Sequence, residues 1–117
     1  MANIIIAPGK YIQGQGELSN IGTYTRPLGE SAFVLISKSG YQRVGGQVEE
    51  SFKAAGCAVH FEYFNGECSK NEINRLKAQL SELGATVVVG IGGGKIHDTA
   101  KAVAHYAGKP VVIVPTI

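Results

Sequence analysis

Apolar residues along this chain alternate between two kinds of pattern. Four short, continuous apolar runs rich in β-branched residues begin 25, 28 and 25 residues apart, at residues 32–36, 57–63, 85–91 and 110–114. Each run has the length of a strand, and each interval is long enough to hold one helix. Continuous rather than alternating apolar runs are typical of strands that are buried on both faces of a parallel sheet.

The intervals between these runs carry apolar residues at the three- and four-residue steps of a helix. The first and third intervals end in Gly56 and Gly108, and glycine is a common helix stop. Their apolar faces are Val44, Val48, Phe52 and Ala55 in the first and Ala100, Val103 and Ala107 in the third, which is expected to span about residues 95–107.

The second interval opens with a helix start signal. Ser69 stands three residues before Glu72, a spacing that predicts a capping box. In that motif the Ser69 hydroxyl accepts from the Glu72 backbone N–H, and the Glu72 side chain reaches back to the N–H of Ser69. The stripe that follows is Ile73, Leu76, Leu80 and Leu83, closed by Gly84.

Strands that alternate with helices of this length predict right-handed βαβ units. We therefore expect an α/β fold, a Rossmann-like doubly wound and mostly parallel sheet, with residues 1–117 forming a single domain. Ahead of the repeating pattern, residues 3–7 and 10–13 are expected to be short strands, and residues 17–24 a helix.

Composition narrows the class of partner. Apolar residues make up 44% of the chain, and the formal charge is only +2 with no basic run, which argues against nucleic acid and anionic membranes. No apolar run approaches the ~20 residues of a membrane span. Cys57 and Cys68 fit reduced thiols in a cytoplasmic protein.

The segment with the clearest chemistry is a buried strand that enters a helix through Gly92, Gly93 and Gly94, followed by Lys95. Glycines let backbone N–H groups approach a ligand, and the helix N-terminus and the lysine both favour an anion such as a diphosphate. The spacing fits neither the GxGxxG fingerprint, whose third glycine would fall on Lys95, nor the phosphate loop, which needs Ser or Thr where Ile96 stands.

Each of these residues also has a plainer interpretation. The glycines could serve only a tight turn with a solvated Lys95, but three in a row before a lysine favour anion binding. Asp98, at the end of the first helical turn, either favours the helix dipole or contacts ribose or diphosphate. The histidines at 60, 97 and 105 lack metal-ligand spacing and are interpreted as structural or surface residues, and Cys68 as the entry to a capped helix.

Four motifs together resemble a known family. They are PGKYIQG at residues 8–14, FNGECS at 64–69 with Glu72 and Ile73, GIGGGK at 90–95 with DTAK at 98–101, and the final PTI. They resemble the glycerol dehydrogenases of the metal-dependent, iron-type alcohol dehydrogenase superfamily. The resemblance spans the whole chain and covers the N-terminal third of a typical member.

The resemblance implies a dehydroquinate-synthase-like N-terminal domain that binds NAD. It also implies a C-terminal helical domain whose aspartate and two histidines hold a divalent metal, zinc in the glycerol enzymes. Such enzymes oxidise glycerol to dihydroxyacetone and pass hydride to NAD. Carried over by position, Gly93, Gly94 and Lys95 hold the diphosphate, Asp98 lies near the nicotinamide, and Thr116 contacts the nucleotide from the next strand end.

Two departures from the family change these expectations. Ser37 stands where the family places an aspartate that grips the adenosine ribose, and Lys38 follows it, so NADP is not excluded beside NAD. The chain also ends at Ile117, before the expected metal ligands. We expect it to bind a dinucleotide weakly without turnover, and to self-associate through a face that a helical domain would cover, in a family that commonly forms homo-oligomers.

Two alternatives to an oxidoreductase domain stay open at the level of sequence. One is a non-catalytic nucleotide-binding or regulatory module that keeps the glycine loop. The other is a structural interaction domain whose glycine turn binds nothing.

Overall fold

The computed structural model describes residues 2–3, 9–12 and 15–115, with side chains for residues 18–115. Its strands are β1 (Ala2–Asn3), β2 (Gly9–Ile12), β3 (Ser31–Ile36), β4 (Ala58–Tyr63), β5 (Val87–Gly92) and β6 (Val111–Pro115). Within this part of the chain they form one sheet in the order β1-β2-β6-β5-β3-β4. Only β1 and β2 pair antiparallel, and every other neighbouring pair is parallel.

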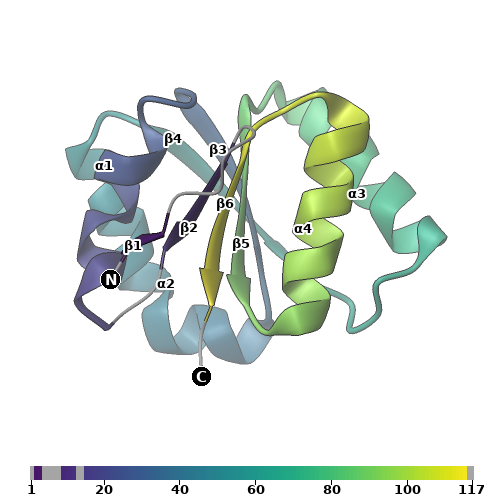
Figure 1. Cartoon of the computed structure of the whole chain (residues 1–117), viewed down its shortest axis with the longest axis horizontal. Helices are drawn as coiled ribbons and strands as arrows, with labels where there is room; N and C mark the ends of the chain where they lie inside the picture. Colours follow the sequence, from purple (N-terminus) through teal and green to yellow (C-terminus); the bar gives the residue numbers. More distant parts are fainter. Residues whose placement is uncertain (1, 4–8, 13–14, 116–117) are drawn as a thin grey trace.

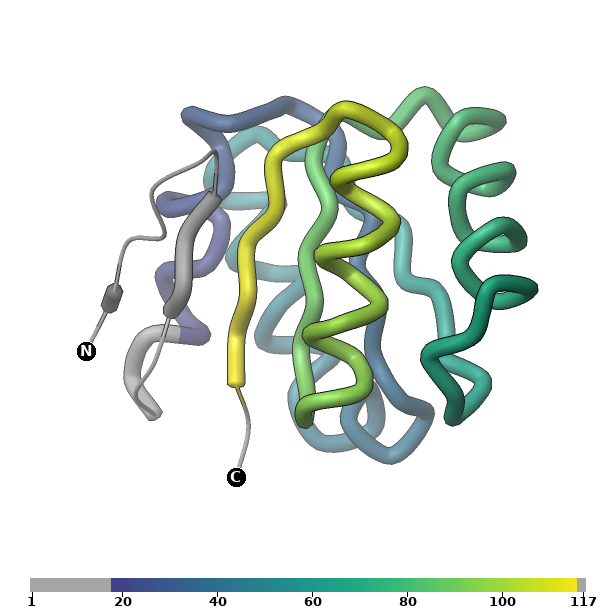
Figure 2. The backbone as a smooth tube through the Cα atoms, turned by 45° about the vertical axis from the view of Figure 1, so that its right-hand side comes forward, coloured from purple at the N-terminus to yellow at the C-terminus, as the bar shows by residue number. Residues whose placement is uncertain are grey.

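The helices cover both faces of this sheet (Figures 1 and 2). They are the 3-10 helix η1 (Gln15–Asn20), α1 (Ile21–Thr25), α2 (Lys38–Ala54), α3 (Lys70–Leu83) and α4 (Gly94–Ala107). Residues from α1 and α2 share one buried cluster with the sheet, and residues from α3 and α4 share the other. The doubly wound, mostly parallel α/β fold predicted from the sequence is thus confirmed.

The predicted elements agree with the structure apart from their ends. Each of the four apolar runs overlaps one of the strands β3 to β6, with ends that differ by at most two residues. The helix expected over residues 17–24 is split, because η1 continues directly into α1. Of the two expected early strands, residues 3 and 10–12 are in strands, while residues 4–7 and 13 lie outside the described residues.

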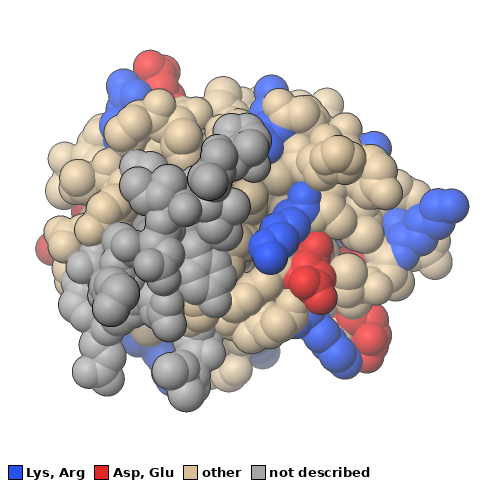
Figure 3. All heavy atoms as spheres, viewed as in Figure 1, with Lys and Arg blue, Asp and Glu red and all other residues tan. Residues whose placement is uncertain are grey.

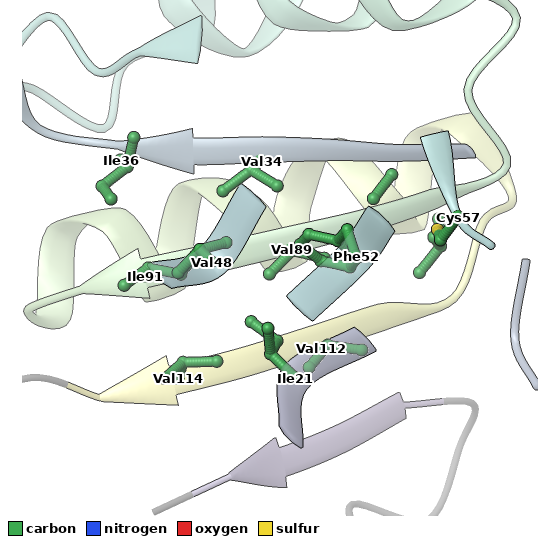
Figure 4. Close-up of a cluster of buried hydrophobic side chains, with 12 residues drawn as sticks. Ile21, Val34, Ile36, Val48, Phe52, Cys57, Val89, Ile91, Val112 and Val114 are labelled. Atoms are coloured by element: carbon green, nitrogen blue, oxygen red, sulfur yellow. The ribbon is translucent and has the colours of Figure 1, made fainter. Parts of the chain in front are cut away.

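Alternate residues of the strands belong to the buried cluster on the α1 and α2 side of the sheet (Figure 4). Val34, Val89 and Val112 from three adjacent parallel strands point to this face, where Ile21 and Phe52 cover them. All five side chains are fully buried. The strand residues one step away, such as Phe33 and Val88, belong to the opposite cluster under α3 and α4, so both strand faces are used.

One expected core residue is exposed. Leu76 and Leu80 are buried as predicted, but Leu83 is 46% exposed. It is the last residue of α3, and the chain turns there through Gly84 at φ 68°. Leu83 lines a surface hollow with His60 and Glu62 of β4, which is the edge strand of the sheet that the described residues form.

Candidate functional site

The predicted anion-binding residues lie at the carboxyl ends of two neighbouring strands. Ile36 of β3 pairs with Ile91 of β5. From these ends the chain leaves in opposite directions, through α2 toward β4 and through α4 toward β6. Figure 1 shows the β5 and β6 arrowheads at the same lower edge where α4 begins. Such a switch point leaves a crevice beyond the strand ends, which is where ligands bind in open α/β sheets.

Two glycines of β5, Gly90 and Gly92, are required by the packing and the backbone conformation. A Cβ on Gly90 would lie 2.7 Å from the Ala100 Cβ, so this glycine allows α4 to pack closely on β5. Gly92 has φ +150°, and a Cβ there would lie 2.6 Å from Ile96 Cδ1. Residues other than glycine rarely adopt that backbone conformation.

Gly93 and Gly94 have no such structural reason. A Cβ at either position would meet nothing within 4 Å among the described residues, and Gly93 has an ordinary φ of −91°. Both are exposed. The space beside both glycines at the start of α4 is therefore open among the described residues.

The N-terminus of α4 is capped differently from those of the two other long helices. Ser37 Oγ accepts from the Gly40 N–H at 3.0 Å at the start of α2, and Ser69 Oγ accepts from the Glu72 N–H at 3.1 Å at the start of α3. In α4 the cap residue is Gly93, and among the described residues no side chain caps this end. The first amides of a helix have no partner within it, so an anion could occupy the position of the missing cap.

Lys95 lies beside this end, but it already has a counter-ion. Its Nζ lies 3.1 Å from Glu67 Oε1, and the two side chains are 64% and 73% exposed. Glu67 belongs to the loop between β4 and α3. The pairing of two residues 28 positions apart was not predicted from the sequence, because it depends on where the loop between β4 and α3 lies relative to α4.

The loop that carries Glu67 is held by hydrogen bonds. The Asn65 N–H donates to Glu72 Oε2 at 3.1 Å, and the Glu67 N–H donates to Asn65 Oδ1 at 3.1 Å. The predicted capping box is therefore half right: Ser69 caps the helix, but Glu72 does not return a bond to it. The Glu72 carboxylate serves Asn65 and Arg75 instead.

Arg75 ties this loop to the end of β4. Its Nε lies 2.7 Å from Glu72 Oε1, its Nη1 lies 2.9 Å from Glu62 Oε2, and its Nη2 donates to the Tyr63 carbonyl at 3.2 Å. Hydrogen bonds from Arg75, and one from the Asn65 N–H, lower the pKa of the fully buried Glu72 carboxyl against the effect of burial. Bonds to Glu72 and then Glu62 raise the pKa of Arg75, so Arg75 and Glu72 both stay charged at neutral pH.

The remaining predicted residues have mixed outcomes. Asp98 is exposed, but the prediction that it ends the first helical turn is wrong, because α4 begins at Gly94 and its first turn holds no acidic residue. Ser37 follows β3 directly, as expected, and its hydroxyl both caps α2 and lies 3.3 Å from Ser39 Oγ. Thr116 lies outside the described residues.

The described residues do not fit a zinc site. Among residues 2–3, 9–12 and 15–115, no group of three or more His, Cys, Asp or Glu side chains could hold a metal ion. His60 stacks on Phe33 with ring centroids 5.9 Å apart, and His105 packs edge-on against Tyr106. Both contacts agree with a structural role for these histidines.

Charge is mixed on the face seen in Figure 3, where basic and acidic side chains alternate over α3 and α4. The described helices include none that is both long enough and apolar enough to span a membrane. Because charge is mixed on this face, the start of α4 is the local feature here that is suited to an anion.

Fold and site place the chain among doubly wound α/β proteins with a glycine turn at the switch point of the sheet. The sequence profile of the family "Iron-containing alcohol dehydrogenase" matches residues 8–117. The chain belongs to this family.

Individual relatives of known sequence or structure support this family membership. A glycerol dehydrogenase of Escherichia coli O6:H1 is 49% identical over 119 aligned residues, which cover all of this chain and 32% of that protein. A crystal structure of a probable glycerol dehydrogenase from Sinorhizobium meliloti 1021 has a TM-score of 0.78 and 38% identity, over 90% of this chain and 28% of that one. The chain thus spans about a third of the length of the curated relatives it matches.

A more distant structure supports the fold alone. A 2-deoxy-scyllo-inosose synthase has a TM-score of 0.78 at 20% identity, over 98% of this chain and 35% of that one. The dehydroquinate-synthase-like form of the α/β fold, expected from the resemblance, is confirmed.

Proposed function

We propose that this chain is the NAD-binding domain of a polyol oxidoreductase of the glycerol dehydrogenase type. The observation that carries the proposal is the start of α4 at the switch point of the sheet, where no described side chain caps the helix and a Cβ on Gly93 or Gly94 would meet open space. The family membership and the glycerol dehydrogenases among its relatives supply the ligand class and the reaction class.

In this proposal the diphosphate of the dinucleotide lies against Gly92, Gly93 and Gly94, with Lys95 as its nearest cation. Ser37 faces the adenosine ribose from the end of β3, and Asp98 faces the nicotinamide side. Thr116 completes the set from beyond the described residues. A helix end supplies only ~0.3–2 kcal/mol, whereas micromolar binding needs about 8 kcal/mol, so the loop orients the phosphates while other contacts hold the rest of the ligand.

When bound, NAD would accept the hydride of an alcohol that is being oxidised to a ketone. The residues described here would bind and orient the dinucleotide, and they do not include the zinc ligands that the family resemblance implies. We therefore expect the 117-residue chain by itself to bind NAD without oxidising glycerol. In a longer form the partners would be the dinucleotide and a small polyol.

Calorimetry tests the binding half of this proposal. ADP-ribose and NAD should bind the purified chain, adenosine should bind much more weakly, and Lys95→Gln should weaken both phosphorylated ligands. Equal binding of adenosine and ADP-ribose would show that the helix end takes no part. Zinc-dependent oxidation of glycerol by the 117-residue chain would overturn the expectation that it lacks turnover.

A further inference from the structure

We propose that Glu67 is a specificity-determining residue that selects a diphosphate esterified at both ends over nucleotides with a terminal phosphate. This inference rests on the proposed function, because it concerns the same anion site. Its starting point is the ion pair between Glu67 Oε1 and Lys95 Nζ, which are 3.1 Å apart beside the uncapped end of α4.

The Glu67 carboxylate stays near the site because its backbone is held. The Glu67 N–H donates to Asn65 Oδ1, and the Asn65 N–H donates to the buried Glu72. Arg75 bonds both Glu72 and the Tyr63 carbonyl at the end of β4. A ligand can displace the exposed carboxylate from Lys95 by rotating its side chain, but the charge cannot move far away.

A negative charge held beside Lys95 opposes the binding of an anion there in proportion to the charge of that anion. A dinucleotide diphosphate is esterified at both ends, so it carries one charge on each phosphate. ADP and ATP end in a free phosphate that carries most of a second charge near neutral pH. Glu67 therefore costs the terminal-phosphate nucleotides more binding affinity than it costs a dinucleotide, while Lys95 and the helix end attract both kinds of ligand.

The chain offers a matched control for this effect. Glu30 is 77% exposed and pairs with Arg26 at 3.3 Å, so its ion pair resembles that of Glu67. It directly precedes β3 and therefore lies at the amino ends of the strands, whereas the proposed site lies at their carboxyl ends. Glu67→Gln and Glu30→Gln each remove one negative charge and one exposed ion pair, but only the first change is at the site.

The test is calorimetric titration of ADP-ribose and ATP into the wild-type chain and both variants, in EDTA at low ionic strength. Removing one nearby exposed charge should raise ATP affinity by about two- to fivefold. ADP-ribose should gain less than ATP, and Glu30→Gln should bind both ligands as the wild type does. The gain should shrink in high salt, because exposed charges are screened.

The outcomes separate this inference from the proposed function. Equal gains for ATP and ADP-ribose in Glu67→Gln, or the same gains in Glu30→Gln, would overturn the role of Glu67 while nucleotide binding stands. Failure of the wild type and of both variants to bind ADP-ribose would overturn both proposals.

Discussion

The Cβ atom of Ala100 lies 2.7 Å from the position that a Cβ atom on Gly90 would take. The missing side chain at Gly90 therefore lets α4 pack closely against β5. Both residues are buried, so neither has room to move away from an added methyl group.

Gly90→Ala should therefore destabilise the chain by about 1–3 kcal/mol, the usual cost of overpacking a core. Urea unfolding followed by circular dichroism measures this change. The control is Gly46→Ala, because Gly46 lies in α2 with nothing near its Cβ position, and the same substitution there should stabilise by about 0.5–1 kcal/mol. If both variants unfold like the wild type, the packing argument fails.

Gly94→Ala should separate stability from ligand binding. Gly94 begins α4 and has open space around its Cβ position, so alanine should leave stability unchanged or raise it by up to about 1 kcal/mol. The methyl group would occupy the space in front of the first amides, and the affinity for ADP-ribose should fall about tenfold, or 1.4 kcal/mol. Undiminished binding by a stable Gly94→Ala protein would place the diphosphate elsewhere.

Ser37→Asp should increase the preference for NAD over NADP. Aspartate caps helices as well as serine does, so α2 should keep its start, while the new carboxylate would grip ribose hydroxyls and repel a 2′-phosphate. We expect the ratio of NADH to NADPH affinity, measured by cofactor fluorescence, to rise by about tenfold, or 1.4 kcal/mol. Ser37→Ala, which adds no charge, should leave that ratio near the wild-type value. An unchanged ratio in the aspartate variant would refute the placement of Ser37 at the ribose.

Stability should fall in acid because of Glu72. Bonds from Arg75 and the Asn65 N–H lower its pKa below the ordinary 4.5, so its contribution is fully present above pH 4.5 and is lost as the pH falls through the lower folded value. Glu72→Gln should destabilise by about 1–2 kcal/mol at pH 7, because it weakens the buried hydrogen bonds to Arg75 and Asn65 while Arg75 keeps its ion pair with Glu62, and it should flatten the acid limb of the stability curve.

The exposed Glu82 on the same helix provides the comparison. Glu82→Gln should leave stability between pH 3 and 7 close to that of the wild type. Should Glu72→Gln keep the full wild-type dependence on pH, the network around Arg75 would have no part in acid unfolding.

The sequence predicted the fold well because its signals are local. Each strand is a continuous apolar run, and each long helix has a period and a glycine stop, so βαβ units follow from spacing alone. The side of the sheet on which β6 joins β5, and the pairing of β2 with β6, depend on contacts between distant segments that no local period encodes.

The site was predictable only where one segment forms it. The glycine turn and the cap at Ser69 were visible in the sequence, but the contact between Lys95 and Glu67 requires the loop after β4 to come within side-chain reach of α4. The capping-box pattern also predicted the wrong partner for the Glu72 side chain. Arg75, one turn later, is charged and therefore a stronger hydrogen-bond donor to the carboxylate than the Ser69 N–H. Leu83 is a second example. It falls on the apolar face that the helical period predicts, but it is exposed because it lies beside the edge strand β4.

If anions bind at the start of α4, where no described side chain caps the helix, the thermal stability of the chain reports that binding. Any anion that binds there binds the folded state and not the unfolded one, so it raises the melting temperature in proportion to the logarithm of its concentration over its dissociation constant. Candidate nucleotides can therefore be ranked by thermal shift alone, without an assay of any reaction.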